Sequence, residues 1–130
     1  QTCALPISIN MKYIFLVLLL SACVRAQAQV NVKLGHLKTY VGDSVRVCGK
    51  VEGGTYLPNA NNSPTLINFG MAYPDQLLTV VIFGEHRSLF EGTPETDWVG
   101  KTICVTGKVE LYRQKPQIVV RSAQQIQIQQ

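Results

Sequence analysis

The stretch KTICVTGKVELYRQKPQIVV, residues 101–120, decides the fold class of this chain. It contains two runs rich in β-branched residues joined by a short polar turn, which is the pattern of a β-hairpin. Its first half has a near copy upstream, because residues 103–110 read ICVTGKVE and residues 44–52 read SVRVCGKVE. Each copy combines alternating valines with one glycine and one cysteine. The repeat predicts two strands with the same role in one small β domain.

Further short apolar runs lie between turn residues, and no long segment has the period of a helix. Gly49 is expected to mark a bulge or a tight bend in the first strand. Three strands, a short helix and two more strands are the order of an OB-fold, an all-β, five-stranded Greek-key barrel. Another small barrel or sandwich is the alternative. The expected strands are 45–52, 65–69, 77–83, 102–112 and 116–121, with the helix within 85–92 and a loop at 93–99.

The first 28 residues are expected to lie outside the folded domain. Residues 1–10 are expected to be an artefact, because QTCALPI at residues 1–7 looks like the translation of a sequencing-library adapter; a natural extension is the alternative. Residues 11–28 read as a signal peptide, with a charged start, an apolar run and the cleavage pattern Ala26-Gln27-Ala28. The apolar run is shorter than the roughly twenty residues that span a bilayer.

Export sets the expected location and domain limits. We predict a periplasmic or secreted protein with a lead-in at residues 29–39, a domain at 40–130 and no transmembrane segment in the mature chain. The minor alternative is a lipid anchor on Cys23, because LSAC also fits a lipobox.

The cysteines indicate a disulfide. The chain has four cysteines, and Cys3 and Cys23 lie in the segments assigned to the adapter and the signal peptide. Cys48 and Cys104 then remain. Two cysteines in an exported chain favour a disulfide over a metal site, which would show C-x-x-C or histidine spacing.

Composition restricts the partners only weakly. Residues 29–130 contain six Lys and four Arg against eight Asp or Glu, a net charge of +2. A charge this small permits nucleic-acid binding but does not indicate it.

The sequence shows no pattern of an active site. His36 and His86 stand alone, without ligand spacing to another His, Cys or carboxylate. Glu91, Glu95 and Asp97 cluster in a segment that reads as a polar surface loop, and no glycine-rich phosphate loop occurs. We therefore predict that the chain is not an enzyme and uses neither a cofactor nor a metal.

Four segments, VGDSVRVCGKV, YPDQLLTVVIFG, VGKTICVTGKVELY and KPQIVVRSAQQI, resemble small exported bacterial OB-fold domains. These domains are related to nucleic-acid-binding and anticodon-binding barrels. The resemblance covers nearly all of residues 40–129. It specifies the fold better than the ligand, because OB-folds bind nucleic acids, sugars or proteins.

The resemblance implies that the two repeated segments are strands one and four, paired antiparallel at the seam of the barrel. Facing Cys48 with Cys104 then faces Val47 with Val105, so that inward side chains match. Directly opposed residues lie within disulfide range. The two cysteines are expected to staple the seam.

The resemblance also implies a binding face on strands two and three, flanked by the loops that follow strands one and four. Aromatic rings there would stack on bases while Lys and Arg meet phosphates, as single-strand binders require. The predicted partner is single-stranded DNA or RNA; the alternative is an accessory module for an envelope protein or a glycan. For Phe69 a place in the core is an open alternative, and for Tyr112, Arg113 and Lys115 the alternative is an ordinary hairpin turn that is polar for solubility. The candidate residues are Tyr56, Phe69, Tyr73, Arg87, Tyr112, Arg113 and Lys115.

Overall fold

The computed structural model describes residues 29–130. The adapter segment, the signal peptide and the lipid site at Cys23 lie outside the described residues and stay predictions. No helix in this part of the chain is long and apolar enough to cross a membrane.

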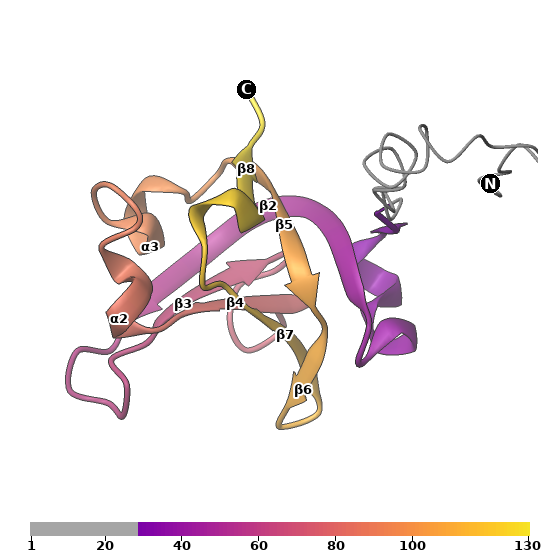
Figure 1. Cartoon of the computed structure of the whole chain (residues 1–130), viewed down its shortest axis with the longest axis horizontal. Coiled ribbons are helices and arrows are strands. Elements are labelled where there is room, and N and C mark those ends of the chain that lie inside the picture. Colours follow the sequence, from indigo (N-terminus) through magenta and orange to yellow (C-terminus); the bar gives the residue numbers. More distant parts are fainter. Residues whose placement is uncertain (1–28) are drawn as a thin grey trace, which may run out of the picture.

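The described chain is mostly β, with short helices between the strands (Figure 1). The helices are the 3-10 turns η2 (Leu34–Tyr40) and η3 (Ala123–Gln125) and the α-helical turns α2 (Gly84–Arg87) and α3 (Pro94–Asp97). The strands are β1 (Asn31–Val32), β2 (Ser44–Tyr56), β3 (Thr65–Phe69), β4 (Leu78–Ile82), β5 (Thr102–Lys108), β6 (Glu110–Tyr112), β7 (Lys115–Val119) and β8 (Ile126–Ile128).

These strands form a mixed sheet in the order β6-β7-β4-β3-β2-β5-β8, and β1 adds to β2 in parallel. Neighbours along the order are antiparallel except β4 and β7, which are parallel. Only Val109 separates β5 from β6. Its N–H donates to the carbonyl of Asp43, and its own carbonyl accepts from Gly42. One continuous segment thus pairs with β2 through β5 and with β7 through β6.

The repeated motif pairs with itself as expected. β2 and β5 are antiparallel, and their register sets Val47 against Val105 and Cys48 against Cys104. The two sulfurs are bonded, which joins positions 56 apart in the sequence. The predicted disulfide is therefore present. The register holds because strand side chains alternate with period two, so a slip of one residue would turn the valines outward.

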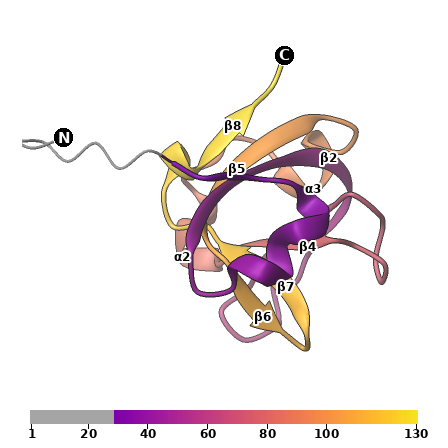
Figure 2. The ribbon, with the colours of Figure 1, turned by 90° about the vertical axis from the view of Figure 1, so that its right-hand side faces the viewer.

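The core lies between the strands and is closed by helical turns on two sides. Leu37 of η2 enters it from one end, where η2 lies across the strands (Figure 2). Trp98, directly after α3, enters on the side of α2 and α3, and Phe90 packs edge-on against its ring. The core residues are Leu37, Val45, Val47, Val51, Ile67, Phe69, Leu78, Val80, Ile82, Trp98, Ile103, Val105, Val109, Ile118 and Val120.

The predicted bulge at Gly49 is wrong. Gly49 pairs regularly with Ile103, and the irregularity in β2 falls between Val51 and Gly53, where the strand pairs with β3. Gly49 is instead a point of close packing. A Cβ there would lie 2.4 Å from Cδ1 of Leu34.

Three helical segments, η2, η3 and α3, were not predicted. η2 falls in the expected lead-in, and α3 falls in the expected loop at residues 93–99. α3 begins with Pro94 in its first turn, where a missing N–H costs nothing. It packs against β2 at Gly54, where a Cβ would lie 2.7 Å from the Cα of Glu95. Glycine is the residue that allows this approach.

Candidate nucleic-acid interface

The hairpin of β6 and β7 carries three of the predicted site residues. Tyr112 pairs with Lys115 across a two-residue turn. The two turn residues, Arg113 and Gln114, have φ of 50° and 67°. Positive φ at both positions is the type I′ geometry, whose twist suits two-residue hairpins. The turn leaves Tyr112 58% exposed, with the Arg113 guanidinium 5.4 Å from its ring centroid.

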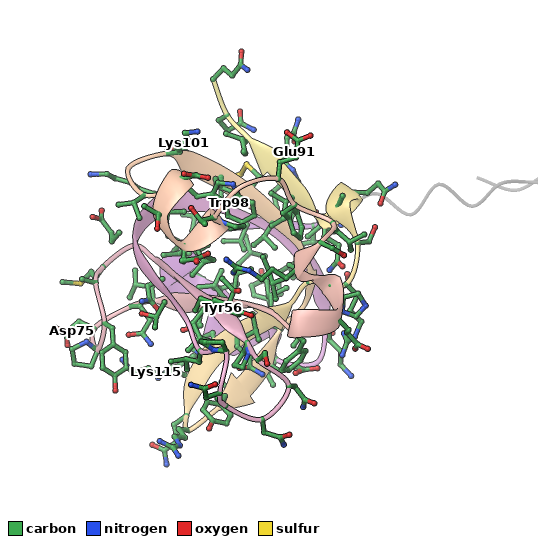
Figure 3. The ribbon with its side chains drawn as sticks, turned by 90° about the vertical axis from the view of Figure 1, so that its left-hand side faces the viewer. Tyr56, Asp75, Glu91, Trp98, Lys101 and Lys115 are labelled. Carbon is green, nitrogen blue, oxygen red and sulfur yellow. A yellow bond between two sulfur atoms is a disulfide. The ribbon has the colours of Figure 1, made fainter. Side chains whose placement is uncertain are left out.

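The loop between β3 and β4 lies against this hairpin. The Lys115 ammonium donates a hydrogen bond to the carbonyl of Pro74. Tyr73, next to Pro74, is 77% exposed. Figure 3 shows Lys115 and Asp75 on the same side of the molecule, away from Lys101 and Glu91. The structure thus places Tyr73, Tyr112, Arg113 and Lys115 on two adjoining loops, which we call the hairpin cluster.

Tyr56 and Arg87 lie at the other end of β3. Tyr56 pairs with Thr65, the first residue of β3, whereas the Tyr73 loop follows its last residue. The Arg87 guanidinium lies 3.8 Å from the centroid of the Tyr56 ring. It also donates to the Thr65 hydroxyl and makes two hydrogen bonds, of 2.8 and 3.0 Å, to the Glu95 carboxylate.

This second group ties α2 and α3 to the sheet, and we call it the Arg87 latch. Hydrogen bonds from Arg87 lower the pKa of Glu95, and the same bonds raise the pKa of Arg87. The charge of Arg87 is therefore balanced within the protein, and its guanidinium covers one face of Tyr56. These contacts give both residues a structural role, and their predicted contacts with a ligand stay predictions.

The prediction of Phe69 as a binding residue needs a correction. Its side chain is fully buried in the core, so it cannot offer a ring to a ligand. Phe69 therefore belongs to the core, which was the alternative left open in the sequence analysis. It faces inward because Ile67 and Phe69 share one side of β3 and both belong to the core.

A row of polar residues that sequence reasoning missed crosses the opposite face of the sheet. Asn68 pairs with Thr79, and Thr79 pairs with Gln117. Gln117 in turn faces Glu110 on β6. Each of the first three sits between two core or buried residues on its strand and so points away from the core; Asn68 is itself buried, whereas Thr79 and Gln117 are half-buried. The sequence shows each of them as a polar residue between apolar ones, but only the pairing register of the strands brings them into one row.

Asn68, Thr79 and Gln117 form what we call the polar row. The row runs across β3, β4 and β7 at the ends next to the hairpin cluster. Amide and hydroxyl groups both donate and accept hydrogen bonds, so they suit the edges of bases or sugars equally. Within residues 29–130, no three His, Cys, Asp or Glu side chains gather in a way that could hold a metal ion.

No protein-family profile and no curated protein matches the sequence. Among solved structures the chain is similar to yeast Stn1 and Ten1, with a TM-score of 0.56 and 12% identity over 81% of this chain and 65% of that chain. It also resembles the S. pombe Stn1-ten1 complex, with a TM-score of 0.49 and 13% identity over 67% of this chain and 58% of that one.

A third similar structure is a putative aspartyl-tRNA synthetase from Leishmania major Friedlin, with a TM-score of 0.48 and 10% identity over 83% of this chain and 22% of that one. The aligned part is thus less than two thirds of each of these three chains. At such low identity, the likeness to yeast Stn1 and Ten1 shows a shared fold and supports the predicted OB-fold-like architecture.

Proposed function

We propose that this chain is a binding module for single-stranded nucleic acid whose interface consists of the hairpin cluster and the polar row. One observation carries the proposal: Tyr73 and Tyr112 are the two most exposed aromatic side chains of the described part, and Arg113 and Lys115 adjoin them. Exposed rings beside cations suit a strand whose bases stack and whose phosphates are paired.

The proposal includes a closed OB-fold barrel. The continuous β5–β6 segment bonds to β2 at one end and to β7 at the other, which completes a ring through β3 and β4. In such barrels the outward face of strands two and three and the loop between strands four and five bind oligonucleotides. The polar row and the hairpin cluster occupy those positions here.

We also propose that the chain works in the periplasm of a bacterium or outside the cell. The Cys48–Cys104 disulfide supports an oxidising compartment, because such bonds are rare in cytosolic proteins. The strand would then be extracellular or periplasmic DNA or RNA.

A salt titration tests the proposed function. Labelled single-stranded DNA and RNA of mixed sequence are titrated with the purified chain, with fluorescence anisotropy as the readout. Two phosphate contacts, from Arg113 and Lys115, predict that log affinity falls with log salt at a slope of about −1.4. Tyr112→Ala should weaken binding by about 5- to 100-fold, because each stacked base contributes roughly 1–3 kcal/mol.

A matched pair of arginine variants locates the interface. Arg113→Ala should reduce the magnitude of the slope by about 0.7. Arg121→Ala removes an exposed arginine that follows β7, away from the hairpin turn, and should leave the slope unchanged. Absence of salt-dependent binding to either DNA or RNA would refute the proposal. Equal effects of the two variants would show that the interface does not lie at the hairpin cluster.

A protein partner is the second candidate, and one feature favours it over a glycan. An apolar groove of about 510 Å³ runs between the segment that links α2 to α3 and β8, with Leu89, Phe90 and Ile128 among its walls. β8 ends the strand order of the described sheet, so one of its edges is free. Capture of one discrete envelope protein, lost in Leu89→Glu, together with no oligonucleotide binding, would support this candidate.

The proposal involves no catalytic step. Incubation with nuclease and phosphatase substrates, with and without divalent metal, measures this directly. Substrate turnover that copurifies with the chain and disappears when the chain is unfolded would contradict a purely binding role.

A further inference from the structure

A small pocket continues from the hairpin cluster. It lies between η2, the loop that joins β3 to β4, and the start of β7, and its volume is about 270 Å³. Leu34, Leu77 and Pro116 supply apolar walls, and Lys115 belongs both to the pocket and to the hairpin cluster. Sites for drug-sized ligands are about 300–1,000 Å³, so this pocket suits a smaller, flat group.

The charges at the pocket are mixed. Lys38 and Lys115 line it, and so does the carboxylate of Asp75, which attracts a group that carries N–H donors. The cations then serve the backbone of the strand outside the pocket, where Lys115 adjoins Arg113 and Tyr112.

Gln76 supplies an unused hydrogen-bond acceptor at this site. Its side chain is 9% exposed and lines the pocket. The amide Nε2 donates to the Thr79 hydroxyl at 3.2 Å. Its Oε1 is buried and accepts no hydrogen bond from any residue that the structure describes. Buried acceptors are nearly always paired, so this oxygen indicates a missing donor.

We propose that the pocket takes one amino-bearing base, such as cytosine, from a strand bound at the hairpin cluster, and that its exocyclic amine donates to Oε1 of Gln76. This inference rests on the proposed function. Because Oε1 is shielded from solvent, the base reaches it only when a wall side chain moves, and Leu77, which is 39% exposed, is the wall residue that the proposal requires to move. Thymine has an acceptor at the ring position where cytosine carries its amine, so it faces Oε1 unfavourably.

The test compares two homopolymers of about twelve nucleotides, oligo-dC and oligo-dT, which both stack weakly and offer the same base in every register. Binding of each to the purified full chain is measured by anisotropy across a salt series. One added hydrogen bond to a buried acceptor predicts about tenfold tighter binding of oligo-dC. This comparison needs no variant.

Two variants then assign the preference to Gln76. Gln76→Leu and Gln76→Met both remove the carboxamide, and the unbranched methionine serves if leucine does not fit; thermal unfolding verifies that each folds. Either folded variant should bring the oligo-dC to oligo-dT ratio to about one, with the salt slope unchanged because neither variant removes a charge. Tyr112→Ala is the control, because it should weaken both oligonucleotides equally.

The possible results separate this inference from the proposed function. Salt-dependent binding without a preference for oligo-dC overturns the inference and leaves the proposed function standing. A preference that persists in a folded Gln76 variant overturns it too. No binding of either oligonucleotide refutes the proposed function, and the inference falls with it.

Discussion

Replacing Cys48 and Cys104 together with alanine removes the covalent link between β2 and β5. The disulfide closes a loop between positions 56 apart in the sequence. In the chain-entropy account, a loop of this length corresponds to about 14 cal/mol/K, or roughly 4 kcal/mol at about 25 °C. The seam also keeps its backbone ladder and its facing valines without the bond. We therefore expect the double variant to fold with a lower free energy of unfolding.

Thermal and urea unfolding measure this effect. A loss of roughly 4 kcal/mol in a domain of this size lowers the melting temperature by about 15–30 °C. The wild-type chain in reductant should shift by the same amount, while the double variant should not respond to reductant. Intact mass reports the bond independently, through a rise of about 2 Da on reduction.

The single variants add a control on packing. Cys104 is buried and Cys48 is exposed, so Cys104→Ala also removes packed atoms whereas Cys48→Ala mainly breaks the bond. A double variant that loses less than about 1 kcal/mol would refute the reasoning, because the loop closed by the bond would then contribute almost nothing.

Two further predictions concern the α3 side of the domain. Gly54→Ala should lower the free energy of unfolding by about 1–3 kcal/mol in urea, because its Cβ would meet the Glu95 backbone at 2.7 Å. Gly53→Ala is the matched control, because a Cβ there meets nothing within 4 Å. Equal losses in the two variants would contradict the close-packing argument. Arg87 lowers the pKa of Glu95, so the ionised carboxylate adds stability that is complete above its unfolded pKa of about 4.3 and disappears as the pH falls through the lower folded value. Glu95→Gln should therefore lower stability at neutral pH and weaken the acid dependence between about pH 5 and pH 3, and an unchanged acid limb would contradict this role.

The strand framework could be predicted because its signals are local and redundant. In both copies of the repeated motif, valines alternate with polar residues, and the cysteines fix the one register that keeps the valines inside. β3 was predicted at its observed limits, 65–69, because turn residues bound it on both sides. The helical turns lacked such signals. η2 buries only Leu37 and α3 only Pro94, so neither shows an apolar stripe.

The candidate site also has a part that the sequence predicts and a part that it does not. Tyr112, Arg113 and Lys115 were predicted from a turn, where neighbours in sequence are neighbours in space. Arg87 and Glu95 meet although they lie on two separate helical turns, α2 and α3, of which α3 packs against β2, and no local pattern reveals that contact. The role proposed for Gln76 was equally hidden, since the pocket that it lines also takes residues from η2 and β7, which lie far from it in the sequence.

The arrangement of the cations explains how a chain of low net charge can still have a binding surface. Arg87 is neutralised by Glu95, whereas Arg113 contacts only the ring of Tyr112 among the described interactions. Two stacked bases contribute roughly 2–6 kcal/mol together, which alone corresponds to dissociation constants from tens of millimolar to tens of micromolar. On this scale one further base contact makes the affinity about tenfold tighter. The hairpin cluster is thus a weak platform on its own, and the adjoining Gln76 pocket is the feature that would make its binding selective.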